Sequence, residues 1–301
     1  MFTKNKMKLI RKSIIFFIYF IIITGILEIT SCNILNHRKA PSTIIITPFE
    51  EDFFISDIKL GYKARNNHTV HVRQLSNRDS LIYAASYSTD SLGRRIALFN
   101  DTTRSEYAIF FGGSFVFGDG LEDSETLPNC LAQKSDAFNV YNYAFSGYGP
   151  QQVYALTDCI KIREEIREKE GIAFYIFMDD HIFRTIGDRN TMDWGSRFPR
   201  YVKNDSDIVI KGTLAKNSML VESFIKRINK SYLLTVLNID LVRILLSKAA
   251  IKNTIDLIEA SRNNYKSAFG NDNFYVVLYP WSQVNIRPML ESKKIKTIDF
   301  S

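Results

Sequence analysis

The sequence predicts an α/β domain built on a parallel sheet with helices on both faces, preceded by an N-terminal apolar helix and a β-rich extension. The 301-residue chain is 46% hydrophobic and 24% charged, which is typical of a globular protein and excludes a disordered or disulfide-framework protein. Apolar strand-like runs alternate with helix-like segments from residue 106 onward, whereas residues 14–27 form one uncharged apolar run behind a basic leader. We therefore expect residues 1–35 to be a signal-anchor or lipoprotein signal segment, residues 36–105 the extension, and residues 106–301 the α/β domain.

The N-terminal segment has the charge pattern of a membrane-targeting sequence. Five basic residues precede the run at 14–27, and apolar character continues from Ser13 to Leu35 with Glu28 as the single charged interruption. An excess of Lys and Arg ahead of the run favours a signal anchor with its N-terminus in the cytoplasm. Residues 29–32 (Ile-Thr-Ser-Cys) also resemble a lipobox, which would make Cys32 the lipidated residue of a lipoprotein. A cleaved signal peptide is the third interpretation, and all three place residues 36–301 outside the cytoplasm.

The charge and cysteine patterns argue against two other classes. Five basic residues against Glu28 place +4 of the net charge of +7 in residues 1–32, which leaves +3 for the rest of the chain. No stripe of Lys and Arg with interleaved aromatic residues occurs, so we expect no nucleic-acid partner. Cys32, Cys130 and Cys159 form no CxxC motif and no Cys/His cluster, so we expect no bound metal. Pairing of Cys130 with Cys159 in an oxidising compartment stays open.

Local patterning predicts the elements of the extension and of the first half of the α/β domain. In the extension, residues 43–47 and 80–87 have the composition of strands, and residues 87–95 that of a turn. In the α/β domain we expect strands at Tyr107–Phe111, Phe138–Tyr143 and Ile172–Met178, and helices at Ser124–Lys134, with Ser124 as a cap, and Pro150–Lys169. This alternation indicates parallel strands joined by crossover helices.

A helical insertion is expected at about residues 182–270, before the last strands. After a polar stretch over Asp188–Asp207, helical spacing of apolar residues appears at Leu214–Ile228 and at Leu233–Ile258. Such a stripe usually faces the core, and a membrane or partner surface is the alternative. Fourth and fifth strands are expected at Phe274–Tyr279 and from Lys296 to Phe300.

A serine directly follows the first strand of the α/β domain. Gly112 and Gly113 precede Ser114, and glycines there allow a sharp turn and the close approach of a substrate. The hydroxyl is expected at the carboxyl edge of the parallel sheet, where ligand sites of α/β proteins form. A nucleophilic serine also needs a base and oxyanion donors. Taken alone, the Gly-Gly-Ser sequence is more often a simple turn than a nucleophile site.

Three blocks together carry a family resemblance. They are Phe111-Gly-Gly-Ser-Phe-Val-Phe-Gly-Asp-Gly120, Asn142-Tyr-Ala-Phe-Ser-Gly-Tyr-Gly-Pro150, and Asp179-Asp180 at the end of the third strand. Their order resembles the SGNH (GDSL-like) hydrolase superfamily, and most closely its membrane-anchored or exported bacterial members. The resemblance runs from about Tyr107 to Asp180, and more loosely to residue 300. It implies a three-layer, flavodoxin-like fold.

The resemblance assigns roles residue by residue. Ser114 matches the nucleophile, and its backbone N–H would be an oxyanion donor. Ala144 stands where the family has its oxyanion glycine, Asn142 matches the asparagine that opens this block, and Gly113 replaces the aspartate of the GDS motif. Asp179 stands where the family has its oxyanion asparagine. An ionised carboxylate accepts hydrogen bonds and cannot donate one, so Asp179 is expected to repel an oxyanion unless it is protonated or paired.

The catalytic base of the family is missing from this sequence. The family carries a D-x-x-H motif near its C-terminus, whereas this sequence has no D-x-x-H and no histidine beyond His181. Two explanations are compatible with this: the chain is shorter than its relatives at the C-terminus, or the domain has lost its base and has a non-catalytic role.

His181 has three alternative roles. It follows Asp179 and Asp180 at the end of the third strand, where two carboxylates are expected to raise its pKa. It could serve as a substitute base for Ser114, as a metal ligand with the two aspartates, or as part of a structural network with Arg184. His68 and His71 lie in the extension, where surface or structural roles are expected, and His37 lies near the membrane segment.

The resemblance implies an extracytoplasmic serine esterase or O-acyltransferase without a cofactor. Ser114 would attack an ester carbonyl, and exported relatives suggest acyl groups on surface carbohydrate or lipid as substrates. A catalytically inactive SGNH-like module that binds a glycan or a partner is the alternative, and a truncated product that folds poorly is the third hypothesis.

Overall fold

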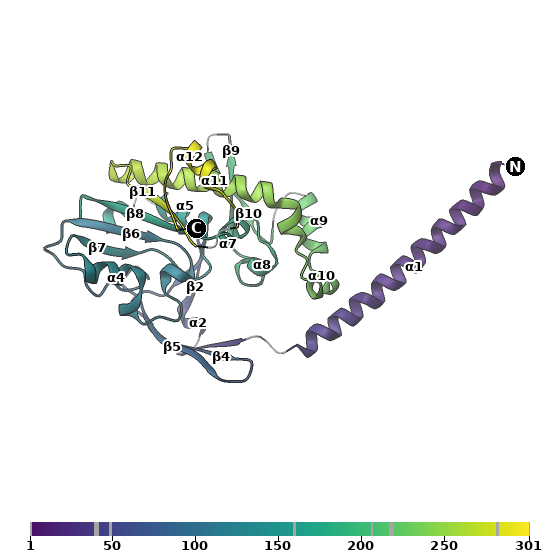
Figure 1. The fold of residues 1–301 in the computed structure, drawn as a ribbon, viewed down its shortest axis with the longest axis horizontal. Coiled ribbons are helices and arrows are strands. Elements are labelled where there is room, and N and C mark those ends of the chain that lie inside the picture. Colours follow the sequence, from purple (N-terminus) through teal and green to yellow (C-terminus); the bar gives the residue numbers. More distant parts are fainter. Residues whose placement is uncertain are drawn as a thin grey trace.

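A computed structural model describes residues 2–38, 42–47, 50–158, 161–205, 207–216, 220–280 and 283–300 of the chain (Figure 1). Its centre is a five-stranded sheet in which every neighbouring pair of strands is parallel. The strands are β6 (Glu106–Phe111), β7 (Phe138–Asn142), β8 (Glu170–Phe177), β11 (Phe274–Leu278) and β12 (Lys296–Asp299). They lie in the order β7-β6-β8-β11-β12. The predicted α/β class and all five predicted parallel strands are thereby confirmed.

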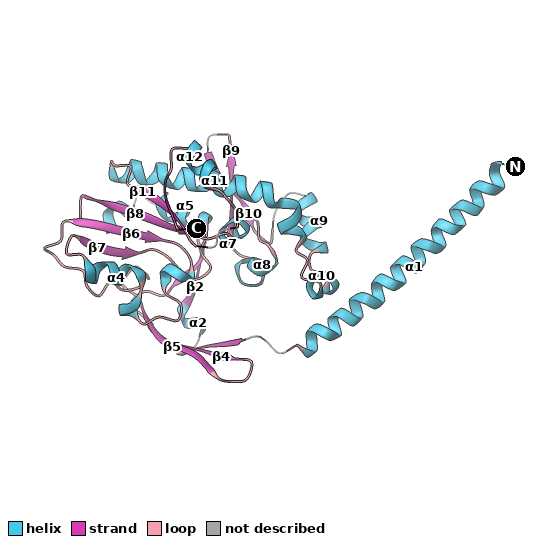
Figure 2. Cartoon of the chain, in the orientation of Figure 1, coloured by secondary structure: helices cyan, strands magenta, loops and turns pink. Residues whose placement is uncertain are grey.

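The central strand β6 is buried on both sides, which explains its uninterrupted apolar sequence. Side chains alternate along a strand, so Tyr107, Ile109 and Phe111 enter one hydrophobic core and Ala108 and Phe110 enter another. The first core is completed by residues of α5 (Pro150–Thr157), α7 (Asp180–Arg184), α11 (Leu241–Phe269) and α12 (Arg287–Ser292). The second core contains residues of α3 (Ser114–Phe117) and α4 (Leu127–Lys134) together with the extension. Figure 2 shows the helices and the additional strands arranged around this sheet.

The extension is β-rich, as expected, and shares its core with the parallel sheet. It contains an antiparallel sheet of β1 (Ser42–Thr47), β4 (Thr69–Ser76) and β5 (Leu81–Ser88), and a hairpin of β2 (Phe54–Asp57) and β3 (Gly61–Ala64) after α2 (Glu50–Phe53). Buried residues such as Phe53, Val72 and Tyr87 belong to the same cluster as Phe110 and Phe117. The extension therefore covers one face of the parallel sheet and helps to hold the segment that follows β6.

One fully buried arginine connects the extension to that segment. The guanidinium of Arg95 donates to the carboxylate of Asp123 at 2.6 Å and to the carbonyl oxygens of Ser86, Phe117, Gly118 and Leu121 at 2.7–3.3 Å. Asp123 opens a short 3₁₀ turn, Asp123–Glu125, ahead of α4. All five donors of this planar cation are thereby occupied, as burial of a charge requires.

Residues 182–270 contain more than the predicted helices. After α8 (Arg189–Gly195), an antiparallel hairpin of β9 (Pro199–Asn204) and β10 (Asp207–Thr213) replaces part of the polar stretch. The helix predicted from Leu214 begins later, as α9 (Leu220–Ile228), because Leu214 still follows the hairpin and its N–H donates to the carbonyl of Phe198. The region is therefore a mixed insertion and not the helical one that we expected.

The single helix predicted over Leu233–Ile258 is in fact two helices. The short α10 (Tyr232–Val236) ends before Asn238, whose φ of 54° is incompatible with a right-handed helix. Asp240 then starts α11 by accepting hydrogen bonds from the N–H groups of Val242 and Arg243. A side chain that caps a new helix cannot be distinguished from an ordinary helical residue by apolar spacing alone.

The N-terminal helix α1 (Phe2–His37) is long, apolar and exposed. Its segment Ile10–His37 is long and apolar enough to cross a membrane, and it has the composition of a signal sequence or an anchor. The helix continues through the boundary that we expected at residue 35. Near its C-terminal end, the carboxylate of Glu28 accepts from Ser231 Oγ and from the N–H of Tyr232 at 2.9 Å, at the start of α10.

Candidate active site

The carboxyl edge of the parallel sheet brings the predicted residues of all three blocks together. Ser114 follows β6, Asn142 ends β7, and Asp179 follows β8. In the order β7-β6-β8, the chain leaves β6 toward one neighbour and returns on its other side, so the β6/β8 boundary is a topological switch point. Ligand sites of open α/β sheets form outside such a point. The location of the predicted site is therefore one at which this fold can hold a ligand.

Ser114 is the first residue of the short helix α3, and its surroundings explain the two preceding glycines. A Cβ atom on Gly112 would lie 2.6 Å from Val116 Cγ2, and one on Gly113 would lie 2.8 Å from Arg184 Nη1. The carbonyl of Ser114 accepts from the N–H groups of Gly118 and Asp119 at 2.9 and 3.0 Å. The half-buried hydroxyl makes no hydrogen bond to any residue that the structure describes. The backbone of Ser114 is thus held by hydrogen bonds, whereas its Oγ forms none with the described residues.

Asn142 and Ala144 form a tight local unit. The side-chain oxygen of Asn142 accepts from the N–H of Ala144 at 3.1 Å, and its amide nitrogen donates to the carbonyl of Val116 at 3.0 Å. Both residues are buried. Asn142 thereby ties the end of β7 to α3, and the N–H group of Ala144 that was predicted as an oxyanion donor already has an acceptor.

Asp179 has a structural partner in the loop that follows β11. Its Oδ2 accepts from the N–H groups of Gln283 and Val284 at 2.6 and 3.1 Å. The two backbone donors compensate the negative charge of this carboxylate. The carboxylate connects the ends of β8 and β11 at the candidate site.

His181 is fully buried, and its environment differs from the predicted one. Its Nδ1 lies 2.9 Å from the hydroxyl of Tyr175, and its ring stacks on that of Tyr175 with a centroid separation of 5.7 Å. Burial, with a smaller contribution from the positive charge of Arg184, lowers the pKa of His181 well below its usual range. The predicted rise in pKa was therefore wrong, because burial dominates and the two aspartates pair with other groups, Asp179 with backbone N–H groups and Asp180 with Arg243.

No hydrogen bond joins His181 to Ser114 among the described residues, so the role of His181 as a base stays a prediction. Its Nε2 has no hydrogen-bond partner in the described part of the chain, and it lies 3.2 Å from the position of a Cβ on Gly113. Arg184, the partner that we expected for His181, instead donates to the carbonyl of Tyr148 at 2.6 Å. No group of three metal-ligating side chains occurs among the described residues, and so the alternative metal site at Asp179, Asp180 and His181 gains no support.

Sequence reasoning missed one polar pair beside Ser114. The hydroxyl of Ser146 donates to both oxygens of Asp119 at 2.6 and 2.8 Å. Loss of hydration raises the pKa of Asp119, although the hydrogen bond from Ser146 and the charges of Arg95 and Arg184 oppose this rise. Asp119 and Ser146 lie in the first and second blocks of the resemblance. Both residues follow neighbouring strands, Asp119 after β6 and Ser146 after β7, and this placement could have suggested that they meet.

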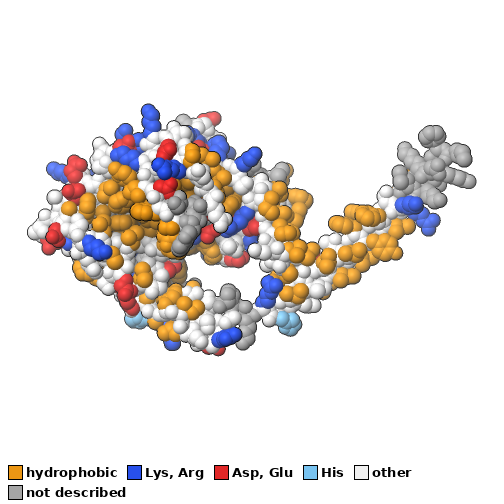
Figure 3. All heavy atoms as spheres, viewed as in Figure 1, with side chains coloured by type: hydrophobic (Ala, Val, Ile, Leu, Met, Phe, Trp, Pro, Cys, Tyr) orange, Lys and Arg blue, Asp and Glu red, His pale blue; other side chains and the backbone are white. Residues whose placement is uncertain are grey.

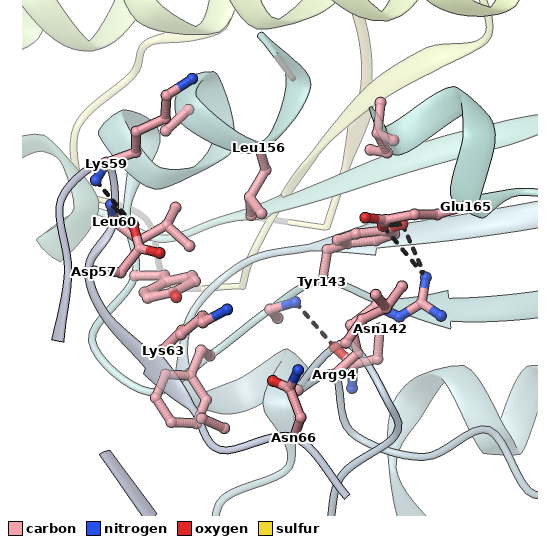
Figure 4. A pocket seen from close by; sticks show the side chains of 18 residues that line it. Asp57, Lys59, Leu60, Lys63, Asn66, Arg94, Asn142, Tyr143, Leu156 and Glu165 are labelled. Atoms are coloured by element: carbon pink, nitrogen blue, oxygen red, sulfur yellow. Dashed lines mark hydrogen bonds and ion pairs between the residues drawn. The ribbon is translucent and has the colours of Figure 1, made fainter. Parts of the chain in front are cut away.

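A cavity lies beside the candidate site and does not include Ser114. It has a volume of about 360 Å³ and lies between the extension and α5 (Figure 4). Its lining includes Asn142, Ala144, Arg94 and Glu165. The hydroxyl of Tyr143 accepts from the guanidinium of Arg94 at 2.8 Å and donates to the carboxylate of Glu165 at 2.5 Å. Neither Ser114 nor His181 is among its lining residues. The Asn142–Ala144 segment therefore contributes both to this cavity and to the edge that carries Ser114.

His68, His71 and Cys130 lie outside the sheet edge that carries Ser114. His71 Nδ1 contacts Ser86 Oγ at 3.0 Å within the antiparallel sheet, and His68 precedes β4. Cys130 is partly buried in α4 and donates weakly to the carbonyl of Glu125. Cys159 lies outside the described residues, so its pairing with Cys130 stays a prediction.

Comparison with known proteins adds no identification. No protein-family model matches the chain, and no curated protein is significantly similar to it.

Proposed function

We propose that this chain is an SGNH-like serine esterase or O-acyltransferase that is anchored by α1 and has its body outside the cytoplasm. The strand order β7-β6-β8-β11-β12 corresponds to 2-1-3-4-5 in order of appearance, which is the flavodoxin-like order of doubly wound sheets. The three blocks of the resemblance meet at the carboxyl edge of this sheet. Acylated carbohydrate or lipid at the cell surface is the proposed substrate, by resemblance alone.

The state of the Ser114 hydroxyl carries this proposal. A serine whose backbone is held by Gly118 and Asp119, and whose Oγ has no structural partner in the described chain, is available to a ligand at the switch point. In the proposed reaction Ser114 Oγ attacks the ester carbonyl, loses its proton to a base and becomes acylated as the alcohol leaves. Water or a second alcohol then accepts the acyl group. The N–H of Ser114 would stabilise the oxyanion.

The proposed reaction requires a base that the described residues do not bring to Ser114. His181 is neutral, as a base must be, but its Nδ1 is engaged by Tyr175 and no hydrogen bond joins it to Ser114. Asp119 is already paired with Ser146. We therefore retain His181 as the candidate base, because its Nε2 has no hydrogen-bond partner among the described residues.

A fluorophosphonate probe, which labels activated serines, tests the proposal on the full chain in detergent. We expect labelling of the unmodified chain and of Ser146→Ala, and no labelling of Ser114→Ala. The Ser146→Ala variant is the matched control, because Ser146 follows the neighbouring strand. An unlabelled wild-type chain that unfolds cooperatively would refute the nucleophile.

A non-catalytic SGNH-like binding module is the second candidate function. The hydrogen bond from the N–H of Ala144 to Asn142 favours it, because that donor is withdrawn from an oxyanion. This candidate predicts that an O-acylated glycan raises the melting temperature of the chain while the probe leaves Ser114 unlabelled.

The contacts of Glu28 favour an uncleaved anchor over the two cleaved alternatives. Cleavage ahead of Cys32 in a lipoprotein, or at a signal-peptide site after Glu28, would remove the carboxylate that accepts from Ser231 and Tyr232. The hydroxyl of Ser231 and the N–H of Tyr232 would then lose this acceptor, and among the described residues only the side-chain cap by Ser231 on Leu234 would remain. An intact mass of the purified protein distinguishes a retained α1 from a processed chain.

A further inference from the structure

The helix α9 has a cluster of paired charges on its inner side and a row of apolar side chains on its outer side. Glu222 is buried and pairs with Arg200 at 2.6 Å and with Lys226 at 3.1 Å. Leu220, Phe224 and Ile228 recur every four residues, which places them on one side of the helix, and all three are exposed. Leu220 and Phe224 are 87% and 64% exposed. A helix at the surface of a soluble protein normally has the opposite arrangement.

This apolar side continues beyond α9. Tyr232 and Leu237, at the two ends of α10, are exposed, and so are Ile244 and Leu245 in the first turns of α11. We call these residues, with the three from α9, the α9–α10 face. Contiguous apolar surface of this kind marks a contact site, because single exposed residues are common but clusters are not.

The α9–α10 face lies next to the apolar helix α1. Helices α1 and α10 pack against each other, and the hydrogen bonds from Ser231 and Tyr232 to Glu28 fix this contact near the end of the apolar segment. Figure 3 shows hydrophobic side chains over α9 and α10 adjoining those of α1. Glu28 is the only acidic residue in the apolar part of α1, and its position there is explained by this cap on α10.

We infer that the α9–α10 face docks into the lipid bilayer that holds α1, at the boundary between headgroups and acyl chains. The inference rests on the proposed anchoring by α1. α10 packs against α1 near the outer end of α1. A bilayer around α1 would therefore also reach α10, and the exposed apolar side chains of α1 and of the α9–α10 face adjoin each other. Arg227 and Lys230 are exposed in the same segment, as is typical of helices that lie in the membrane interface. The buried Arg200–Glu222–Lys226 cluster secures the inner side of α9 to the body.

Lipid-dependent fluorescence quenching of the full chain in phosphatidylcholine nanodiscs tests this inference. In a background of Trp194→Phe and Trp281→Phe, single tryptophans are introduced by Phe224→Trp on α9, Phe20→Trp in α1 and Ile82→Trp in β5. Ile82 is 55% exposed, similar to Phe224, but belongs to the extension, and so it is the matched control. We expect lipids with brominated acyl chains to quench the first two variants and to leave Ile82→Trp unchanged.

The outcomes separate this inference from the anchoring on which it rests. Quenching of Phe20→Trp without quenching of Phe224→Trp would overturn the docked face and leave the anchor intact. Absence of quenching in both would overturn both. A blue-shifted emission from Phe224→Trp that bromine does not quench would assign the face to a protein partner or a second copy, and would also overturn the inference. Leu237→Trp provides the same measurement from the end of α10, should Phe224→Trp fold poorly.

Discussion

Arg95 is expected to be the most sensitive single position for the stability of the candidate site. Replacing it by methionine keeps much of the side-chain volume but removes the charge and all five hydrogen bonds of the guanidinium. Asp123 and the carbonyls of Ser86, Phe117, Gly118 and Leu121 then lose a buried donor. Removing one partner of a buried ion pair costs about 3–5 kcal/mol, because the other partner stays buried without compensation.

The loss for Arg95→Met should fall within this range and not above it. Asp123 retains one donor, the N–H of Ser88 at 3.1 Å, and its side chain is partly reached by water. The guanidinium also lies over the rings of Tyr87 and Phe117, with centroid distances of 4.2 and 5.0 Å, and methionine preserves the dispersion part of these contacts. We therefore expect a decrease of about 3–4 kcal/mol in the free energy of unfolding.

Urea unfolding of the full chain in detergent micelles, followed by circular dichroism, measures this change. Arg78→Met is the matched control, because Arg78 is exposed on the β4–β5 hairpin and takes part in no ion pair of the described chain. We expect the control to change stability by less than about 0.5 kcal/mol. Arg95→Lys should recover only part of the loss, because an ammonium cannot reach five acceptors. A decrease below about 1 kcal/mol for Arg95→Met would refute the structural importance assigned to this cation.

Two further predictions concern buried or capping charges. Burial lowers the pKa of His181, so below about pH 6.5 the unfolded chain binds a proton there and the folded chain does not. The free energy of unfolding should therefore fall by about 1.4 kcal/mol for each pH unit below about 6.5, until the pKa of the folded state is reached. Urea titrations should show that this slope is absent in His181→Phe; equal slopes in both proteins would contradict the burial of a neutral imidazole. Glu28→Gln weakens the cap of α10 by about 0.5–2 kcal/mol, so amide hydrogen exchange at residues 232–236 should accelerate while that of β6 stays unchanged. Unchanged exchange at these amides would show that the cap is not formed.

The strands of the parallel sheet were predictable because their signal is local. Residues 107–111 and 172–178 are continuous apolar runs, which is the pattern of a strand buried on both faces. The placement of Ser114 at the sheet edge followed from the strand that precedes it. The contacts that determine what the site can do are long-range, however. Asp179 pairs with a loop that lies more than 100 residues away in the sequence, and a local sequence pattern does not indicate such a contact.

The errors in the second half have a related cause. Apolar spacing predicted a core-facing helix over Leu233–Ile258, and Ile255 and Ile258 are indeed buried, but Ile244 and Leu245 are exposed. Periodicity measures which residues share a side of a helix and not what covers that side. The same limit applies to the pKa of His181, because the sequence shows two adjacent aspartates but not the burial that lowers this pKa.

Charged contacts connect the α9–α10 face to the candidate site. Arg243, at the start of α11, pairs with Asp180 at 3.0 Å and with the buried Asp188 at 2.6 Å, and Asp180 directly follows the site residue Asp179. Arg189 donates to the carbonyls of Asn229 and Ile239 on either side of α10. Breaking the contact of Arg243 with the buried Asp188 removes the cation that compensates this carboxylate, so the face and the sheet edge should move as one unit. If the face is docked in the bilayer, the edge that carries Ser114 is held at a constant height above it. The proposed enzyme should then favour acyl esters presented at the membrane surface over freely soluble esters, and loss of lipid quenching in a Phe224 variant should be accompanied by loss of that preference.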